Sequence, residues 1–246
     1  MVSGSGCCVM GSPFVVPSDS GIGQSSVWVN CGTSDAPADP RPDSDGFSIK
    51  KRWQLKAKVP SSISARLAWE MLSPHMDPFA PESPLFLMTG PLTGTLASGA
   101  GRVEVLGVAP QQRPAIFSRS GMGGHWGAEV KFSGYDGIVI RGKADKPVYL
   151  EIDDERVAIK DASHLWGKNA YEAEDGIKAV EGDKFECATI GQAGELGVRY
   201  ANIQTRKKSF LGRCGLGAVM GSKLLKGIAV RGSQSVEVHD PEEVNR

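Results

Sequence analysis

Residues 90–142 hold 12 of the 31 glycines of the chain, and this density restricts what the segment can fold into. An ordered glycine loses more backbone entropy than any other residue, so such a cluster needs a physical reason. Either the chain makes left-handed turns there, or its main chain lies close against something bulky. Arg102, Arg113 and Arg119 stand among these glycines. Guanidinium groups beside exposed amides suit a broad, flat ligand that carries phosphate, which is the first functional hypothesis.

The overall composition excludes several classes of partner. The 246 residues allow one large domain or two modest ones. Lys plus Arg equals Asp plus Glu at 28 each, so no bulk charge attracts nucleic acid or a membrane surface. The sequence has no run of about 18 apolar residues, so it predicts no membrane span, and we recognise no signal peptide. We therefore expect a cytoplasmic protein whose anion site, if it has one, is local.

The five cysteines do not form a metal-binding pattern. They are scattered and none belongs to a C-x-x-C pair, so local spacing builds neither a zinc site nor an iron–sulfur cluster. We expect the thiols to be structural or incidental in a reducing compartment. The sequence thus gives no catalytic residue and no protein-ligated metal.

Composition divides the chain into three parts. Residues 1–50 are rich in Ser, Gly, Pro and Asp, which predicts a low-complexity, disordered arm. Residues 51–235 form the folded domain, and 236–246 are the start of a linker to a region beyond this chain.

Within the domain, apolar periodicity and turn residues predict short strands and short helices without regular βαβ alternation, which indicates an α+β fold. We expect helices over 61–73, 124–132, 169–180 and 218–225, strands over 83–88, 102–108, 114–117, 136–140, 187–190 and 227–231, and a hairpin over 148–160. Both halves run from strands through a glycine–arginine turn and a short helix to a strand, so an intertwined duplication is an open alternative.

Two glycine–arginine segments are the candidate binding sites. Gly121, Gly123 and Gly124 precede one short helix, with Arg102 in the same stretch; Gly212 and Arg213 precede another. The dinucleotide fingerprint G-x-G-x-x-G fails at both, because its sixth position is Trp126 in the first and Met220 in the second. A nucleotide-binding module is therefore disfavoured.

The chain resembles the N-terminal domain of the aldehyde ferredoxin oxidoreductase family, the tungsten–pterin enzymes. The matching pieces, in order, are GPLTGT (90–95), Gly101-Arg102, 123–150, DASHLWGK (161–168), IGQAGE (190–195) and 212–230. RSGMGG (119–124) and the small insertion around Gln111-Gln112 are nearer the benzoyl-CoA reductase large-subunit branch.

The resemblance implies two intertwined β-rich halves that form a base for a bis-pyranopterin dithiolene cofactor with tungsten or molybdenum. It implies Arg102 near the magnesium that bridges the pterin phosphates, and pterin contacts from Gly121, Gly123, Gly124, Gly212 and Arg213. Ser209-Phe210 depart from the usual Arg-Ala, which leaves one phosphate contact in doubt. Gly121 replaces a common Asn.

In that family, a longer chain also supplies the cysteines of a [4Fe–4S] cluster and the acid–base residues at the metal. None is present here, so we expect that this chain alone does not turn over substrate. The resemblance implies an aldehyde or acyl oxidoreductase completed by C-terminal domains or a split subunit, with ferredoxin or another iron–sulfur protein as electron partner. The alternative is a truncated, non-catalytic remnant or scaffold that keeps the fold.

Overall fold

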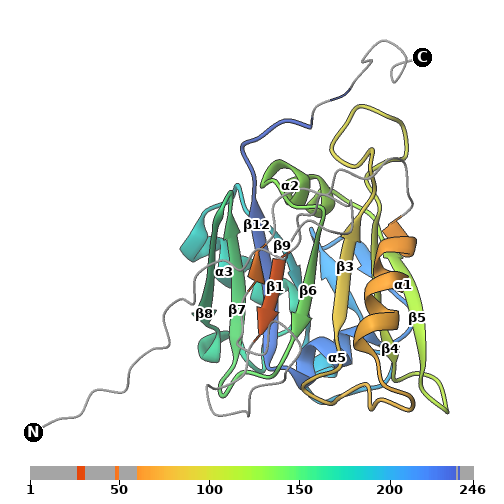
Figure 1. Ribbon diagram of the computed structural model, residues 1–246. Helices are drawn as coiled ribbons and strands as arrows, with labels where there is room; N and C mark the ends of the chain where they lie inside the picture. Colours follow the sequence, from red (N-terminus) through yellow and green to blue (C-terminus); the bar gives the residue numbers. More distant parts are fainter. Residues whose placement is uncertain (1–26, 31–47, 50–59, 237, 239–246) are drawn as a thin grey trace, which may run out of the picture.

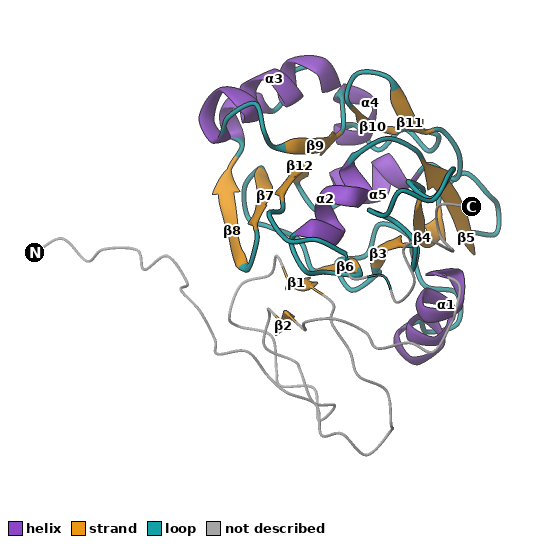
Figure 2. Cartoon of the chain, turned by 90° about the horizontal axis from the view of Figure 1, so that it is seen from above, coloured by secondary structure: helices purple, strands orange, loops and turns teal. Residues whose placement is uncertain are grey.

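The computed structural model describes residues 27–30, 48–49, 60–236 and 238. Most of the predicted arm and linker therefore lies outside the described residues. Within the described part, two six-stranded sheets stand face to face and enclose two short helices (Figures 1 and 2). This α+β architecture confirms the fold class that the sequence predicts.

The first sheet has the order β2 (Ser48–Ile49), β1 (Val27–Asn30), β6 (Gly137–Arg141), β3 (Leu85–Thr89), β4 (Val103–Ala109), β5 (Ile116–Met122). The second has the order β11 (Ser209–Leu211), β10 (Ile203–Thr205), β9 (Glu186–Thr189), β12 (Leu225–Arg231), β7 (Val148–Asp153), β8 (Arg156–Asp161). The helices are α1 (Pro60–Met71), α2 (Trp126–Phe132), α3 (Ala170–Glu181), α4 (Gln192–Glu195) and α5 (Leu216–Ser222), with a 3₁₀ turn, η1, at Ser163–Leu165.

The two sheets are copies of one plan. In each, a hairpin (β1–β2 or β7–β8) comes first, and its first strand pairs in parallel with the last strand of the half, β6 or β12. That last strand pairs antiparallel with β3 or β9, and two more antiparallel strands follow. The duplication left open by the sequence is therefore present in the topology.

A weak repeat in the sequence accompanies the structural one. Helices α2 and α5 begin 90 residues apart, and 126–142 aligns with 216–232 without a gap. Gly-Ala follows the first residue of each helix, and GIVIRG in one half matches GIAVRG in the other. The two glycine–arginine segments consequently occupy equivalent positions, between a strand and its short helix.

The halves intertwine through helices rather than strands, since every strand of the first sheet precedes every strand of the second in the chain. In Figure 2, α2 and α5 lie between the sheets. Trp126 of α2 is buried and donates its indole N–H to the carbonyl of Ile228 in β12, at 3.1 Å. In return, the side chain of Leu216 in α5 reaches Gly107 of β4. Each half thus completes the core of the other.

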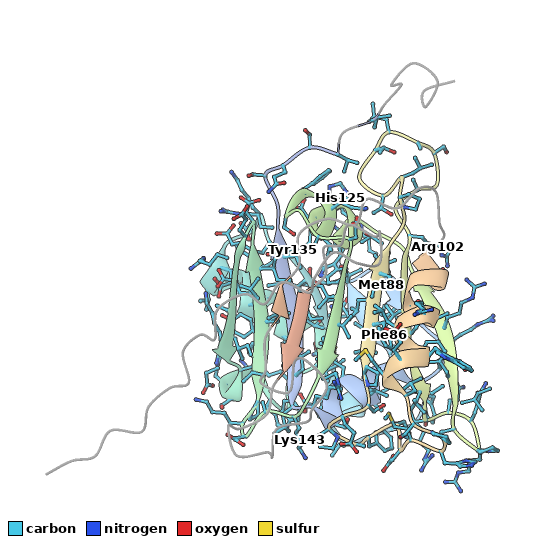
Figure 3. The ribbon with its side chains drawn as sticks, in the orientation of Figure 1. Phe86, Met88, Arg102, His125, Tyr135 and Lys143 are labelled. Carbon is cyan, nitrogen blue, oxygen red and sulfur yellow. The ribbon has the colours of Figure 1, made fainter. Side chains whose placement is uncertain are left out.

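The longer helices cover the outer faces of the sheets. Helix α1 packs Ala68 on an apolar cluster that includes Phe86 and Met88 of β3 (Figure 3), and α3 packs Ile177 on β9 and its neighbours. Helix α3 starts with the predicted Asn169 cap, whose side chain and that of Glu172 form a capping box. None of the described helices is long and apolar enough to cross a membrane.

Local signals predict most elements but miss the shortest. The hairpin over 148–160 and the strand after α2 are found where expected, and Gly134, at φ 87°, ends α2 as predicted. β5 is longer than the predicted 114–117, and α4, β10 and β11 were not predicted. These three have only three or four residues each, too few for a periodic pattern to be visible.

Candidate functional site

The first glycine segment joins β5 to α2. Gly124 has φ 103°, a left-handed conformation that side chains rarely adopt. A Cβ on Gly124 would lie 3.3 Å from the Ser209 hydroxyl oxygen and 3.5 Å from the Thr205 methyl carbon, so this turn sits against the β10–β11 hairpin of the other half. Figure 3 shows His125, the next residue, at the upper end of the molecule.

Arg102 lies near this segment, and its guanidinium group lies beside Gly121 of β5, just before the turn. A Cβ on Gly121 would lie 2.8 Å from Nε of Arg102, so glycine at this position lets the guanidinium lie close to the strand. Gly121 itself is a strand residue paired with Glu104, not part of the turn that the sequence predicts. The strand continues because Ser120 and Met122 keep the alternation of buried side chains. The turn proper is therefore 123–125.

The second segment, between β11 and α5, is held by the β4–β5 hairpin of the first half. Cys214 and Gly215 both have positive φ, 70° and 69°. The Cys214 amide donates to the Gln111 side-chain oxygen at 2.9 Å, and its thiol donates to the Arg119 carbonyl at 3.3 Å. Left-handed backbone at a cysteine costs about 1–2 kcal/mol, so these contacts keep the turn in its shape.

Both segments have open main chain. A Cβ built on Gly123 or on Gly212 would meet nothing within 4 Å. Arg102 and Arg213 are exposed, and within the part of the chain that the structure describes neither makes a salt bridge or a side-chain hydrogen bond. Two unpaired guanidinium groups beside bare main chain are suited to an anionic, flat ligand.

The predicted residues are brought together in two groups rather than one. Arg102 lies against Gly121 of β5, while Arg213 is the neighbour of Cys214, whose thiol contacts Arg119 of the same strand. Gly101 joins the first group, since its Cβ would lie 3.3 Å from the Gly124 carbonyl oxygen. β5 is therefore the common element to which both groups are attached.

Other glycines of the second cluster serve packing. A Cβ on Gly221 of α5 would lie 2.0 Å from the carbonyl oxygen of Gly194 in α4, and one on Gly215 only 1.8 Å from that of Arg199. These glycines allow helix and loop backbones to touch and leave no space for a ligand. Density of glycine alone does not separate the two roles.

Most basic residues of the β10–β11 turn are already neutralised. Arg206 forms a hydrogen-bonded ion pair with Glu186, and Lys207 with Asp175. Burial raises the pKa of the Cys214 thiol, although the adjacent Arg213 charge acts in the opposite direction. Cys214 is accordingly a neutral thiol, and Cys187 is buried with its pKa raised to about 12.

Sequence reasoning missed Thr205 and the role of Gln111. Thr205 lies beside Gly124, and its buried hydroxyl has no hydrogen-bond partner among the described residues. A buried hydroxyl without a partner is costly and therefore calls for an explanation. Its place at the first turn follows only from the packing of β10 against the other half, so no spacing in the sequence could have indicated it.

With this geometry in place, comparison with known proteins decides the family. The family described as "Aldehyde ferredoxin oxidoreductase, N-terminal domain" matches residues 48–232. The chain belongs to this family.

Similar proteins within and near the family support the assignment. A tungsten-containing aldehyde ferredoxin oxidoreductase of Pyrococcus abyssi is 50% identical over 170 residues, 69% of this chain and 28% of that protein. The WOR-like subunit of an aliphatic sulfonate oxidoreductase of Pyrococcus furiosus is 36% identical over 190 residues, 72% of this chain and 29% of that protein. The chain thus spans less than a third of the length of these relatives.

A solved structure has the same fold. The active-site complex BamBC of benzoyl-coenzyme A reductase with 1,5-dienoyl-CoA superposes with a TM-score of 0.77 at 35% identity. The match covers 89% of this chain and 32% of that one. It is consistent with the benzoyl-CoA reductase features noted around 111–124.

Proposed function

We propose that this chain is the cofactor-binding domain of a tungsten or molybdenum bis-pterin oxidoreductase. The observation that carries the proposal is the pair of equivalent strand–turn–helix segments with open main chain, of which the second contains Arg213 and the first has Arg102 beside it. Among the described residues, neither arginine has a salt bridge or a side-chain hydrogen bond. A cofactor with two pterins and two phosphates matches a platform with two such segments. The tungsten-containing relatives support the choice of metal.

The described residues fit such a group. Gly123 and Gly212 leave space at the main chain, and Thr205, whose methyl carbon faces the first turn, has a buried hydroxyl with no partner among the described residues. Arg102 and Arg213 have no ion-pair partner among the described residues, so their guanidinium groups would be available to phosphate oxygens or to phosphates that share a magnesium ion. When bound, the tungsten–pterin group supplies two-electron redox chemistry.

In this proposal, the residues of this chain bind the cofactor and fix its orientation. Arg102, fixed over Gly121, would neutralise phosphate at the first segment; Arg213, held through Cys214 and Gln111, would do so at the second. Ser209 at the first turn offers a hydroxyl where the family commonly has arginine, so that contact is a neutral hydrogen bond here. Gly121 contributes by admitting the Arg102 side chain, and Gly123 and Gly124 by exposing amides.

The completed enzyme would oxidise an aldehyde to a carboxylic acid, or reduce a related acyl substrate. Further polypeptide, as C-terminal domains or a split subunit, would supply a [4Fe–4S] cluster and the proton-transfer groups, with ferredoxin or another iron–sulfur protein as electron partner. The names of the relatives, which include oxidoreductases of aldehydes and of sulfonates, support the class of reaction without fixing the substrate.

The test is cofactor retention. The chain is purified from cells that make the pterin and are supplied with tungstate, and tungsten and pterin are measured per protein. Arg102→Ala should weaken retention by about 1–3 kcal/mol, the loss of a charge-assisted contact, which is roughly 5- to 150-fold. Arg66→Ala is the control, because Arg66 is exposed on α1 and forms an ion pair with Glu70 of the same helix.

Equal retention in Arg102→Ala and the unaltered chain would remove Arg102 from the site. If the unaltered chain, correctly folded, holds neither metal nor pterin even when co-produced with the remainder of a relative, the alternative of a non-catalytic remnant or scaffold replaces the proposal.

A further inference from the structure

A buried ion pair joins α4 to the start of β12. The side chains of Lys226 and Glu195 are both buried, and the ammonium group of the first is hydrogen-bonded to the carboxylate of the second. Lys226 also donates to the Lys168 carbonyl, at 2.8 Å, and Glu195 accepts from the Gly167 amide, at 2.9 Å. The pair therefore ties three segments together: β12, α4 and the loop 166–168 that precedes α3.

Stability alone does not explain this ion pair. Taking two charges out of water costs about as much as their attraction returns, and well-packed apolar side chains in their place are often neutral or stabilising. Apolar side chains lack direction, whereas the hydrogen bonds of Glu195 and Lys226 to the main chain of 167–168 have preferred angles. A buried network whose polar atoms are all paired holds its elements in one arrangement.

Helix α4 transmits its position to α5 without an intervening side chain. A Cβ on Gly194 would lie 2.9 Å from the Gly217 carbonyl oxygen, and one on Gly221 would lie 2.0 Å from the Gly194 carbonyl oxygen. Because backbone meets backbone here, no side chain can absorb a displacement of α4 by changing its rotamer. A shift of α4 would therefore move α5 as well.

The loop that follows α4 supports the second glycine turn, residues 212–215. The Arg199 carbonyl oxygen lies 1.8 Å from where a Gly215 Cβ would be. The Ala201 carbonyl accepts from the Gly217 amide, at 3.1 Å. The turn and the first residues of α5 thus rest on backbone that begins at the end of α4, the helix that the ion pair fixes.

The equivalent position of the first half holds a different pair. In the alignment of the two repeats, Lys226 corresponds to Asp136, which pairs with Lys131, five residues away in α2. That pair joins neighbours in the chain rather than separate elements. The second turn also carries more backbone strain, because Cys214 occupies the left-handed position that Gly124 occupies in the first. The pair that spans separate elements is therefore in the half whose turn needs more support.

We propose that Glu195 and Lys226 are positioning residues for the second glycine turn, and that they hold Cys214 and the adjoining Arg213 in place. The proposal rests on the proposed function for the use of Arg213 by the cofactor, but the coupling between the pair and the turn does not depend on a cofactor. Cys214 reports on this coupling, because its thiol is partly buried and donates to the Arg119 carbonyl. A turn that shifts loses this hydrogen bond and exposes the thiol.

The experiment measures the rate at which iodoacetamide alkylates Cys214 in the full chain without cofactor, with each modified cysteine identified by mass spectrometry. Glu195→Leu with Lys226→Met replaces the ion pair by apolar side chains. It should raise the rate at Cys214 about fivefold, the scale of one lost hydrogen bond, and leave the midpoint of thermal unfolding nearly unchanged. The rate at Cys187, which is buried beneath α3, should not rise.

Two further variants sharpen the result. Lys131→Met with Asp136→Leu removes the pair at the equivalent position of the first half, so the rate at Cys214 should stay that of the unaltered chain. Glu195→Gln with Lys226→Met leaves no buried charge and keeps an acceptor for the Gly167 amide. This variant should give an intermediate rate.

An unchanged rate at Cys214 in the folded Glu195→Leu, Lys226→Met variant would overturn the proposal. An equal rise at Cys187 or in the first-half control would do the same, because it would indicate general loosening. Failure of both altered pairs to fold would make the pair a stabilising part of the core and overturn it too.

Tungsten and pterin retention separates this inference from the proposed function. Retention should fall about tenfold in the Glu195→Leu, Lys226→Met variant, the scale of a weakened charge-assisted contact. Full retention despite faster alkylation of Cys214 would contradict only the role of Arg213 in the proposed function. Lost retention with alkylation of Cys214 unchanged would overturn the positioning role.

Discussion

The two halves of this domain share a topology but use the same turn in different ways. In the first half, the segment between β5 and α2 is open: Gly123 faces no neighbour, and Gly124 meets only side chains of the other half. In the second, Gly212 is open, but Gly215 and the glycines of α5 touch backbone atoms of Arg199, Asn202 and Gly194. The turn between β5 and α2 is therefore open at Gly123. The turn between β11 and α5 is open only at Gly212 and is packed against backbone from Gly215 onward.

The difference shows that glycine serves two different physical purposes in the equivalent turns of the two halves. Where main chain is open, a side chain would obstruct a ligand without disturbing the fold. Where backbone meets backbone at 2 Å or less from a virtual Cβ, any side chain would separate two packed elements. Substitution at each kind of position separates the two reasons.

The largest effect is expected from Gly221→Ala. Its new methyl group would overlap the Gly194 carbonyl and push α5 from α4, which should lower the free energy of unfolding by about 3 kcal/mol or more. Gly123→Ala, in open space and without a positive φ, should change it by no more than about 0.5 kcal/mol. Urea unfolding of both variants measures the contrast.

Gly123→Ala, which should have little effect on stability, should have a large effect on cofactor retention. Gly123→Ala is expected to keep its fold and lose pterin, because its methyl group takes space beside the exposed amides. A Gly123→Ala chain that retains tungsten and pterin fully would mean that this turn does not hold the cofactor.

A smaller effect should follow from Gln111→Ala, which removes the side-chain oxygen of the first half that accepts a hydrogen bond from the Cys214 amide in the second turn. Cys214 could then relax from its left-handed conformation, and Arg213 would move with it. We expect retention of the cofactor to fall several-fold, on the scale of about 1 kcal/mol for one hydrogen bond.

Gln112→Ala is the matched control, since Gln112 is the neighbouring glutamine and its side-chain oxygen accepts from the Ser118 hydroxyl, at 3.3 Å, rather than from the second turn. Gln111→Glu keeps the acceptor oxygen and should restore retention. Equal behaviour of the two alanine variants would show that Gln111 does not position the turn.

The outer faces differ as well. Beside the apolar contacts of α3, the second sheet carries an ionic group in which Tyr149 and Lys160 donate to Glu181 at the end of α3. Burial alone would raise the pKa of Glu181, but the hydrogen bonds from Lys160 and Tyr149 hold it below its ordinary value. Burial would lower the pKa of Lys160, yet its bonds to Glu181 and Glu151 raise it.

The smallest predicted effect is the pH dependence that this group gives to stability. Because the folded-state pKa of Glu181 is lowered, its contribution is complete above the ordinary carboxylate pKa and is lost as pH falls through that value toward the folded one. The raised pKa of Lys160 keeps its contribution until pH rises above the ordinary lysine value. Tyr149→Phe should cost about 1 kcal/mol at neutral pH.

Urea unfolding at neutral and acidic pH checks this, with Tyr171→Phe, an exposed tyrosine of α3, as control. The loss of stability in acid should be shallower in Tyr149→Phe than in the unaltered chain. Parallel acid profiles would assign the pH dependence to other carboxylates.

Much of the fold could be predicted from the sequence because its signals are local. Asn169 and Glu172 indicate the start of α3, Gly134 indicates the end of α2, and the acidic turn before Arg156 indicates a hairpin between two strands. The placement of Gly121 could not be predicted, because the pairing of β5 with β4 is what brings it beside the Arg102 side chain, just before β4. Gln111 and Thr205 are near the turns for the same kind of reason.

By itself the sequence determined the family, the α+β class and the two glycine–arginine segments, since these depend on residue identity and on contacts between near neighbours in the chain. Only the tertiary structure decided which glycines are open and which are packed, and that each half supports the turn of the other. Those properties depend on contacts between residues about 80 to 100 positions apart, such as Gln111 and Cys214 or Gly124 and Ser209. Contacts of that range arise when two repeats pack together, and no local pattern of residues encodes them.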